Sequence, residues 1–176
     1  MKRVLVIAIT LLALTSCGTA AKVSGSIAPC TSINHVGAGS GKLLECVGGG
    51  DGIHLGDLRG PMILNVWGSW CTSCKDELPI LKSFYPKLTG TPILLVGIDV
   101  EETSRVDGLN FMKKESIAWP SLLDPDGRTR GTFGMGVPLT WFIDGDGRVL
   151  YKKIGVLANE KELQNLVAKY FHLEIQ

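Results

Sequence analysis

The sequence predicts an α/β fold in which one mixed β-sheet is covered by helices on both faces. Three features of the chain support this prediction. Apolar runs of strand length alternate with segments of helical spacing, one of these runs is apolar throughout, and the chain closes with a strand pair and an amphipathic helix. Continuous apolar strands are typical of sheets buried on both faces, and alternating strands and helices are typical of layered α/β domains.

The chain begins with the parts of a bacterial secretion signal. Lys2 and Arg3 precede eleven apolar or small residues, which is too few to span a bilayer, because a span needs ~18 or more. Leu14-Thr-Ser-Cys17 resembles a lipobox, in which the cysteine becomes the lipid-bearing N-terminus. We therefore expect a signal peptide at residues 1–16 and lipidation of Cys17. The alternative is a soluble secreted protein with a spare thiol.

One domain is expected to follow a short tether. Residues 17–29 are small and polar without hydrophobic periodicity, which predicts a flexible linker behind the lipidated Cys17. Residues 30–176 have a normal size for a single domain. Without residues 1–16 the chain carries 16 basic and 17 acidic residues, so nothing in its charge would attract nucleic acid.

The first half of the domain contains four predicted elements. Residues 42–55 alternate enough to suggest a small hairpin, and residues 55–60 a short turn of helix. The apolar run Met62–Trp67 predicts a central buried strand. Residues 72–88 have helical spacing, and Pro79 inside this segment should kink the helix about one turn beyond Cys74.

The second half continues the alternation. Residues 92–99 form a continuous apolar run, the pattern of a strand buried on both faces, and residues 160–172 form an amphipathic terminal helix. A hairpin is expected across Asp144-Gly-Asp-Gly147. The remaining predicted elements are a helix at 104–116, a strand at 120–123, a short helix at 128–133, and the hairpin strands 139–143 and 148–154.

Cys71 and Cys74 lie where the predicted central strand passes into a helix. Cysteines three residues apart on the first helical turn face the same way and can form a disulfide, and the helix N-terminus favours a thiolate there. We expect Cys71, at the start of the helix and nearer to solvent, to be the nucleophile. Cys74, one turn deeper, would resolve the mixed disulfide by attacking Cys71. An inert structural disulfide is the alternative.

The other cysteines are divided by role. With Cys17 lipidated and Cys71 and Cys74 paired, Cys30 and Cys46 remain, and free thiols rarely persist in an oxidising compartment. We interpret Cys30 and Cys46 as a structural disulfide, which would stabilise the Gly-rich and Ser-rich N-terminal extension. Two unpaired or transient thiols are the alternative. No metal site is predicted, because the chain has only one Cys-x-x-Cys and the other two cysteines are far apart in the sequence.

These motifs together resemble the thioredoxin superfamily. The resemblance is carried by Trp70-Cys71-x-x-Cys74, the kinked helix, Val137-Pro138 and the terminal hairpin and helix. The lipobox, the extension before the central strand, the strand-helix unit at 92–116 and Cys74-Lys-Asp-Glu-Leu-Pro79 are similar to the TlpA/ResA-like, membrane-tethered thiol-disulfide oxidoreductases of bacteria. This resemblance covers residues 42–173. It implies a thioredoxin-like three-layer fold with a central mixed sheet and an N-terminal hairpin extension.

The resemblance also implies roles for individual residues. The Val137-Pro138 peptide is expected to be cis and to face the dithiol, with Trp70, Val137 and Pro138 binding the client. Thioredoxin has an aspartate six residues before its first cysteine, where this chain has Asn65, which cannot take up a proton near neutral pH. The acid-base role therefore passes to Glu77, which matches the acidic position of the ResA-like motif.

Glu77 also has a simpler interpretation. Asp76 and Glu77 could be first-turn carboxylates that only complement the helix dipole. The sequence leaves these two interpretations of Glu77 open.

The predicted function is reduction of disulfides in exported client proteins, with apocytochrome c a client implied by the resemblance. The chain would be held by its lipid on the outer face of the cytoplasmic membrane and receive electrons from a membrane thiol protein. No cofactor is expected. A disulfide-forming oxidase of the same fold and a copper-binding protein that uses Cys71 and Cys74 as soft ligands are the alternatives. Thr72 and Ser73 add no positive charge between the thiols, which favours the reducing direction.

Overall fold

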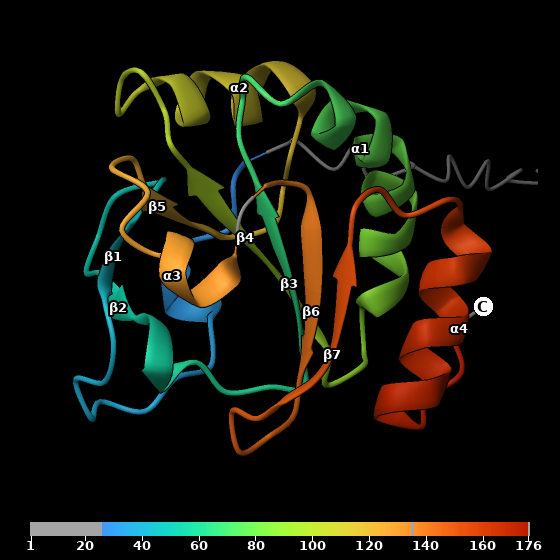
Figure 1. The fold of residues 1–176 in the computed structure, drawn as a ribbon. Helices are drawn as coiled ribbons and strands as arrows, with labels where there is room; N and C mark the ends of the chain where they lie inside the picture. The colour runs from blue at the N-terminus through green and yellow to red at the C-terminus, as the bar shows by residue number, and fades with distance from the viewer. Residues whose placement is uncertain (1–25, 135, 176) are drawn as a thin grey trace, which may run out of the picture.

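The structure, a computed structural model, describes residues 26–134 and 136–175. Within them, seven strands form one mixed sheet in the order β2-β1-β5-β4-β3-β6-β7 (Figure 1). The central strands β3, β4 and β5 are parallel, whereas β1, β6 and β7 each pair antiparallel with a neighbour. The strands are β1 (Leu43–Cys46), β2 (Ile53–His54), β3 (Met62–Trp67), β4 (Leu94–Val100), β5 (Ser121–Asp124), β6 (Leu139–Ile143) and β7 (Val149–Ile154).

Helices cover both faces of this sheet. Figure 1 shows α1 (Thr72–Phe84) beside α4 (Glu160–Phe171) on one side of β6 and β7, with α3 (Arg130–Phe133) on the other. Helix α2 (Asp107–Glu115) connects β4 to β5, as a parallel strand pair requires. This order of strands and helices confirms the predicted thioredoxin-like fold. Strands β1 and β2 form the predicted N-terminal hairpin.

Strand β3 is buried along its whole length because two hydrophobic cores enclose it. Ile63 and Trp67 belong to the core beneath α1, α2 and α4. Met62, Leu64 and Val66 belong to the core beneath the N-terminal extension and α3. This alternation follows from the two-residue period of a strand. It fixes the point where β3 ends and α1 begins in the middle of the domain.

Two boundaries differ from the sequence prediction for physical reasons. The helix predicted over residues 72–88 is α-helical only to Phe84 and continues as the 3₁₀ helix η3 (Tyr85–Leu88). Pro86 lacks a backbone N–H and therefore cannot continue the α-helical hydrogen bonds. The helix predicted from Ser104 starts at Asp107, whose carboxylate accepts a hydrogen bond from the Ser104 N–H at 2.9 Å. Pro79 lies inside α1 without ending it.

A disulfide attaches the N-terminal extension to the sheet. Cys30, in the short helix η1 (Cys30–Ser32), is bonded to Cys46 at the end of β1. Ile27 and Ala28, which the sequence analysis assigns to the tether, already contact the domain: Ile27 packs on a core, and the Ala28 N–H donates to the Ala118 carbonyl at 2.8 Å. The predicted signal peptide and Cys17 lie outside the described residues. No helix among the described residues has the length and hydrophobicity needed to cross a bilayer.

Replacing both Cys30 and Cys46 by alanine should lower the free energy of unfolding by about 3 kcal/mol, because a loop of this length is no longer closed in the unfolded chain. Urea denaturation of the purified domain measures this loss. Replacing Cys71 and Cys74 by alanine opens a much shorter loop and should cost less. Equal stability of wild type and the Cys30/Cys46 variant would show that this disulfide does not stabilise the extension.

Candidate active site

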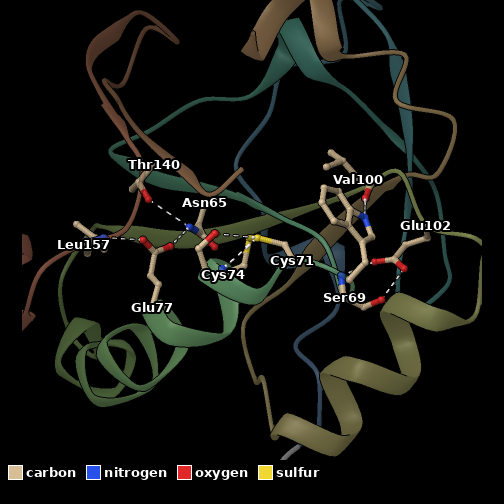
Figure 2. The surroundings of a disulfide bond; sticks show 11 residues. Asn65, Ser69, Cys71, Cys74, Glu77, Val100, Glu102, Thr140 and Leu157 are labelled. Atoms are coloured by element: carbon tan, nitrogen blue, oxygen red, sulfur yellow. Dashed lines mark hydrogen bonds between the residues drawn. A yellow bond between two sulfur atoms is a disulfide. The ribbon is translucent and has the colours of Figure 1, made fainter. Parts of the chain in front are cut away.

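The two cysteines of the Cys-x-x-Cys motif lie at the start of α1, directly after β3 (Figure 2). Cys71 is the N-cap residue of the helix and is bonded to Cys74 in a disulfide. The Cys74 N–H donates to the Cys71 sulfur at 3.0 Å, and the Cys71 N–H donates to the Gly68 carbonyl at 3.1 Å. The Cys71 sulfur thus satisfies a free N–H of the first helical turn, which is the position that favours a thiolate.

Both cysteines are buried in this oxidised form. Cys71 is 4% exposed and Cys74 is 7% exposed, so the expectation that Cys71 lies nearer to solvent is wrong. The reason is packing: both belong to the core that also contains Trp67 and Leu78. The exposed group next to the disulfide is Trp70, at 51%. Its indole N–H donates to the Val100 carbonyl at 3.2 Å.

Glu77 lies on the inner side of the disulfide and is fully buried. Its Oε1 accepts a hydrogen bond from the Asn65 amide at 2.7 Å, and its Oε2 accepts one from the Leu157 N–H at 2.9 Å. Asn65 also donates to the Thr140 hydroxyl at 3.2 Å. Figure 2 shows this group of side chains on the Cys74 side of the disulfide. Asn65 and Glu77, the two positions compared in the sequence analysis, are therefore direct partners.

Burial raises the pKa of Glu77 above its ordinary value, against the opposing effect of the hydrogen bonds from Leu157 and Asn65. A buried carboxylate with two specific partners differs from a solvated one that only complements a helix dipole. The simpler interpretation does not fit Glu77, because Glu77 is buried and neither it nor the exposed Asp76 lies in the first turn of α1. A carboxyl group with a raised pKa can exchange a proton closer to neutral pH.

The Val137-Pro138 peptide is cis, which confirms the expectation drawn from the resemblance. A second cis peptide, Gly60-Pro61, was not predicted. Pro138 is buried and Val137 is half-buried.

A pocket of about 180 Å³ opens beside Trp70 and Val137. Its walls are mainly apolar, with Phe133 of α3 on the far side, and its rim carries an ion pair. In that pair the Arg130 guanidinium donates to both carboxylate oxygens of Glu101, at 2.6 and 2.5 Å, and lowers the pKa of Glu101. The sequence analysis missed this pocket, because its walls come from four separate segments of the chain.

Glu102 is another site residue that the sequence analysis missed. Its side chain is held against the loop that enters α1: Oε1 accepts the Ser69 N–H and Oε2 accepts the Ser69 hydroxyl, both at 2.6 Å. Figure 2 shows Glu102 and Glu77 on opposite sides of the disulfide. Two buried carboxyl groups therefore flank the cysteines. Two acidic residues directly after an apolar strand were the signal that could have drawn attention to Glu102.

Cys30 and Cys46 do not belong to this site. Cys46 lies on β1, which β5 and β4 separate from β3. Among residues 26–134 and 136–175, no three His, Cys, Asp or Glu side chains gather as they would around a metal ion.

The chain is similar in sequence to known thiol-disulfide oxidoreductases. Residues 42–152 match the AhpC/TSA family. Thiol-disulfide oxidoreductase ResA of Bacillus cereus is 34% identical over 114 residues, which are 64% of this chain and 65% of that protein. The thiol:disulfide interchange protein DsbE of Pseudomonas fluorescens biotype C is 32% identical over 130 residues, 72% of this chain and 70% of that protein.

A similar arrangement is found in a solved structure. StoA from Bacillus subtilis superimposes with a TM-score of 0.58 and 26% sequence identity, over 69% of this chain and 92% of that one. The matched region spans just under two thirds of the ResA protein.

The raised pKa of Glu77 predicts a pH dependence of stability. A carboxyl group whose pKa is raised by folding binds more protons in the native than in the unfolded state, so its contribution to stability is lost as the pH rises from about 4.5 through the raised value. Relative to Glu77→Gln, the oxidised wild type should therefore lose free energy of unfolding over this window, by about 1.4 kcal/mol for each tenfold change in proton affinity.

Urea denaturation of both proteins at a series of pH values measures this difference. Asp76→Asn removes the exposed carboxylate that directly precedes Glu77 and is the matched control. It should not reproduce the pH dependence of the free energy of unfolding. A constant difference between wild type and Glu77→Gln would contradict the prediction.

Proposed function

Because this chain belongs to the AhpC/TSA family, we propose that it is a thiol-disulfide oxidoreductase that reduces disulfides of exported proteins through Cys71 and Cys74. One observation carries the proposal: the two cysteines are bonded to each other at the first turn of α1, with the Cys71 sulfur accepting the Cys74 N–H. The same hydrogen bond would stabilise a Cys71 thiolate after reduction. An inert structural disulfide would not require a buried carboxyl such as Glu77 nearby.

The reaction begins with the reduced dithiol. The Cys71 thiolate attacks one sulfur of the client disulfide, forms a Cys71-client bond and releases the other client sulfur as a thiolate. Cys74 then attacks the Cys71 sulfur, which restores the Cys71–Cys74 bond and releases the second client thiolate. Two electrons pass from the protein to the client, and the two client thiolates take up protons.

Glu77 assists the second step in this proposal. A thiol at the buried position of Cys74 must lose its proton before it can attack, and Glu77 lies one helical turn further along α1. Burial that raises the pKa of Glu77 makes it a better proton acceptor. Asn65 and the Leu157 N–H hold the carboxylate in place.

The client peptide is proposed to lie across Trp70, Val137 and Pro138. Support comes from the exposure of Trp70 and from the apolar pocket between Trp70, Val137 and Phe133. An apolar side chain near the client cysteine would fit this pocket. Apocytochrome c is a client class within the proposal.

The proposed place of action is outside the cytoplasm. The signal pattern of residues 1–16 supports export, and Leu14-Thr-Ser-Cys17 supports a lipid anchor on the outer face of the cytoplasmic membrane. The Cys30–Cys46 disulfide is consistent with an oxidising compartment. A membrane thiol protein would return electrons to the oxidised dithiol.

Cys74→Ser should trap a mixed disulfide, because Cys71 can still attack but nothing displaces the client. The purified reduced variant, incubated with insulin as a test protein, should give a covalent adduct on a non-reducing gel that dithiothreitol releases. Cys71→Ser is the matched control and should give little adduct. If the two variants trap insulin equally, Cys71 is not the nucleophile, and if neither does, the exchange reaction is absent.

The direction of the reaction is measured by the reduction potential of Cys71–Cys74. We expect a value closer to the ~−270 mV of thioredoxin than to the ~−120 mV of DsbA, because neither Thr72 nor Ser73 carries a positive charge that would stabilise the reduced form. Equilibration with glutathione, read by alkylation of free thiols, gives the potential. A value near ~−120 mV would assign the protein as a disulfide-forming oxidase instead.

A further inference from the structure

The carboxyl end of β4 holds the loop that carries the active-site cysteines. Three hydrogen bonds connect them: the Val100 carbonyl accepts the Trp70 indole N–H, and the Glu102 carboxylate accepts both the N–H and the hydroxyl of Ser69. Glu102 is only 8% exposed. Its carboxylate is therefore held, with little contact with water, against Ser69, which lies two residues before Cys71 in the chain.

A second carboxyl group lies beside Glu102 and has no role in the proposed reaction. Asp99, the next-to-last residue of β4, is completely buried, and neither of its oxygens has a hydrogen-bonding partner among the described residues. It packs directly on the first turn of α2, where a Cβ on Gly108 would overlap the Asp99 Oδ2. The acidic groups around it are Glu102 and Asp107.

Asp99 and Glu102 are both buried, and two neighbouring carboxyl groups away from water are not both ionised near neutral pH. Burial, followed by the proximity of Glu102 and Asp107, raises the pKa of Asp99 to about 10. Asp99 therefore keeps its proton at neutral pH. Glu102, whose two oxygens accept hydrogen bonds from Ser69, carries the charge.

We propose that the Glu102 carboxylate, held against Ser69 by two hydrogen bonds, positions the active-site loop, and that its negative charge disfavours the Cys71 thiolate. The N-terminus of α1 favours the thiolate, and the Glu102 charge opposes it. The reduced dithiol is thereby less stabilised than in an oxidase, which makes the protein a better electron donor. This inference rests on the proposed exchange function of Cys71 and Cys74.

Glu102→Gln tests the effect of the charge, because glutamine keeps the shape of the side chain and one acceptor for the Ser69 N–H. In the reduced domain, the ultraviolet absorbance of the Cys71 thiolate should appear at lower pH than in wild type, with about a tenfold increase in thiol acidity. The equilibrium with glutathione should shift several-fold toward the reduced dithiol at pH 9 and much less at pH 7, because the charge acts only on the thiolate.

Two matched variants separate charge from packing. Glu101→Gln removes the neighbouring carboxylate, whose charge Arg130 already compensates, and should leave the thiolate titration where it is. Asp99→Asn replaces a neutral group by a neutral group, so it should also leave the titration unchanged. It should, however, remove the infrared carbonyl band of a protonated carboxylic acid from the spectrum of the domain.

Two results would overturn the inference. One is a thiolate titration in Glu102→Gln that coincides with that of wild type, and the other is a shift in Asp99→Asn as large as that in Glu102→Gln. Failure of the proposed function gives a different result, because the wild-type dithiol would then not equilibrate with glutathione at all.

Discussion

The site depends on one constraint: strand β3 is enclosed by two hydrophobic cores and must end where α1 begins. Because its side chains alternate between the cores, β3 can neither slide nor rotate without exposing apolar groups. The first turn of α1 is therefore fixed in position, and the Cys71 sulfur, as N-cap, meets the Cys74 N–H. The position of the two thiols is thus a property of the whole sheet, although the motif itself is only four residues long.

Around these thiols the fold places two carboxyl groups with different environments. Glu77 accepts hydrogen bonds from Asn65 on β3 and from the backbone before α4, whereas Glu102 accepts two from the loop that leads into α1. In the proposed reaction, the first lies on the side of Cys74, the sulfur that loses a proton late. The second lies on the side of the sulfur that attacks first. With the proposed roles of Glu77 and Glu102, proton transfer and redox balance would depend on different residues.

The sequence predicted most of the fold because its signals are local. The central strands β3 and β4 are mainly apolar, each with one polar residue, and the longer helices α1 and α4 have an apolar stripe, so the element order and the N-terminal hairpin could be predicted from local patterns. The end of α1 at Phe84 was missed although Pro86 was a visible sign. The burial of Cys71 could not be read, because the pattern at a helix start does not say which distant residues will cover it.

The site was predictable to the extent that its residues are close in the chain. Cys71, Cys74 and Glu77 share one helix, so their spacing alone places them together. The contact of Glu77 with the Leu157 N–H joins residues 80 positions apart, and no local pattern reveals it. Asp99 gave a partial sign, since an acidic residue at the end of an apolar strand needs either water or a proton.

The connectivity of the two disulfides affects how the chain matures. The four cysteines among the described residues could be joined in three ways, and each is bonded to the nearest of the other three, with sequence separations of 16 and 3. A polypeptide that emerges from a translocation channel amino end first would present Cys30 and Cys46 as a pair before the later two arrive. Under the proposed export, this order of emergence would favour the pairing that the structure contains.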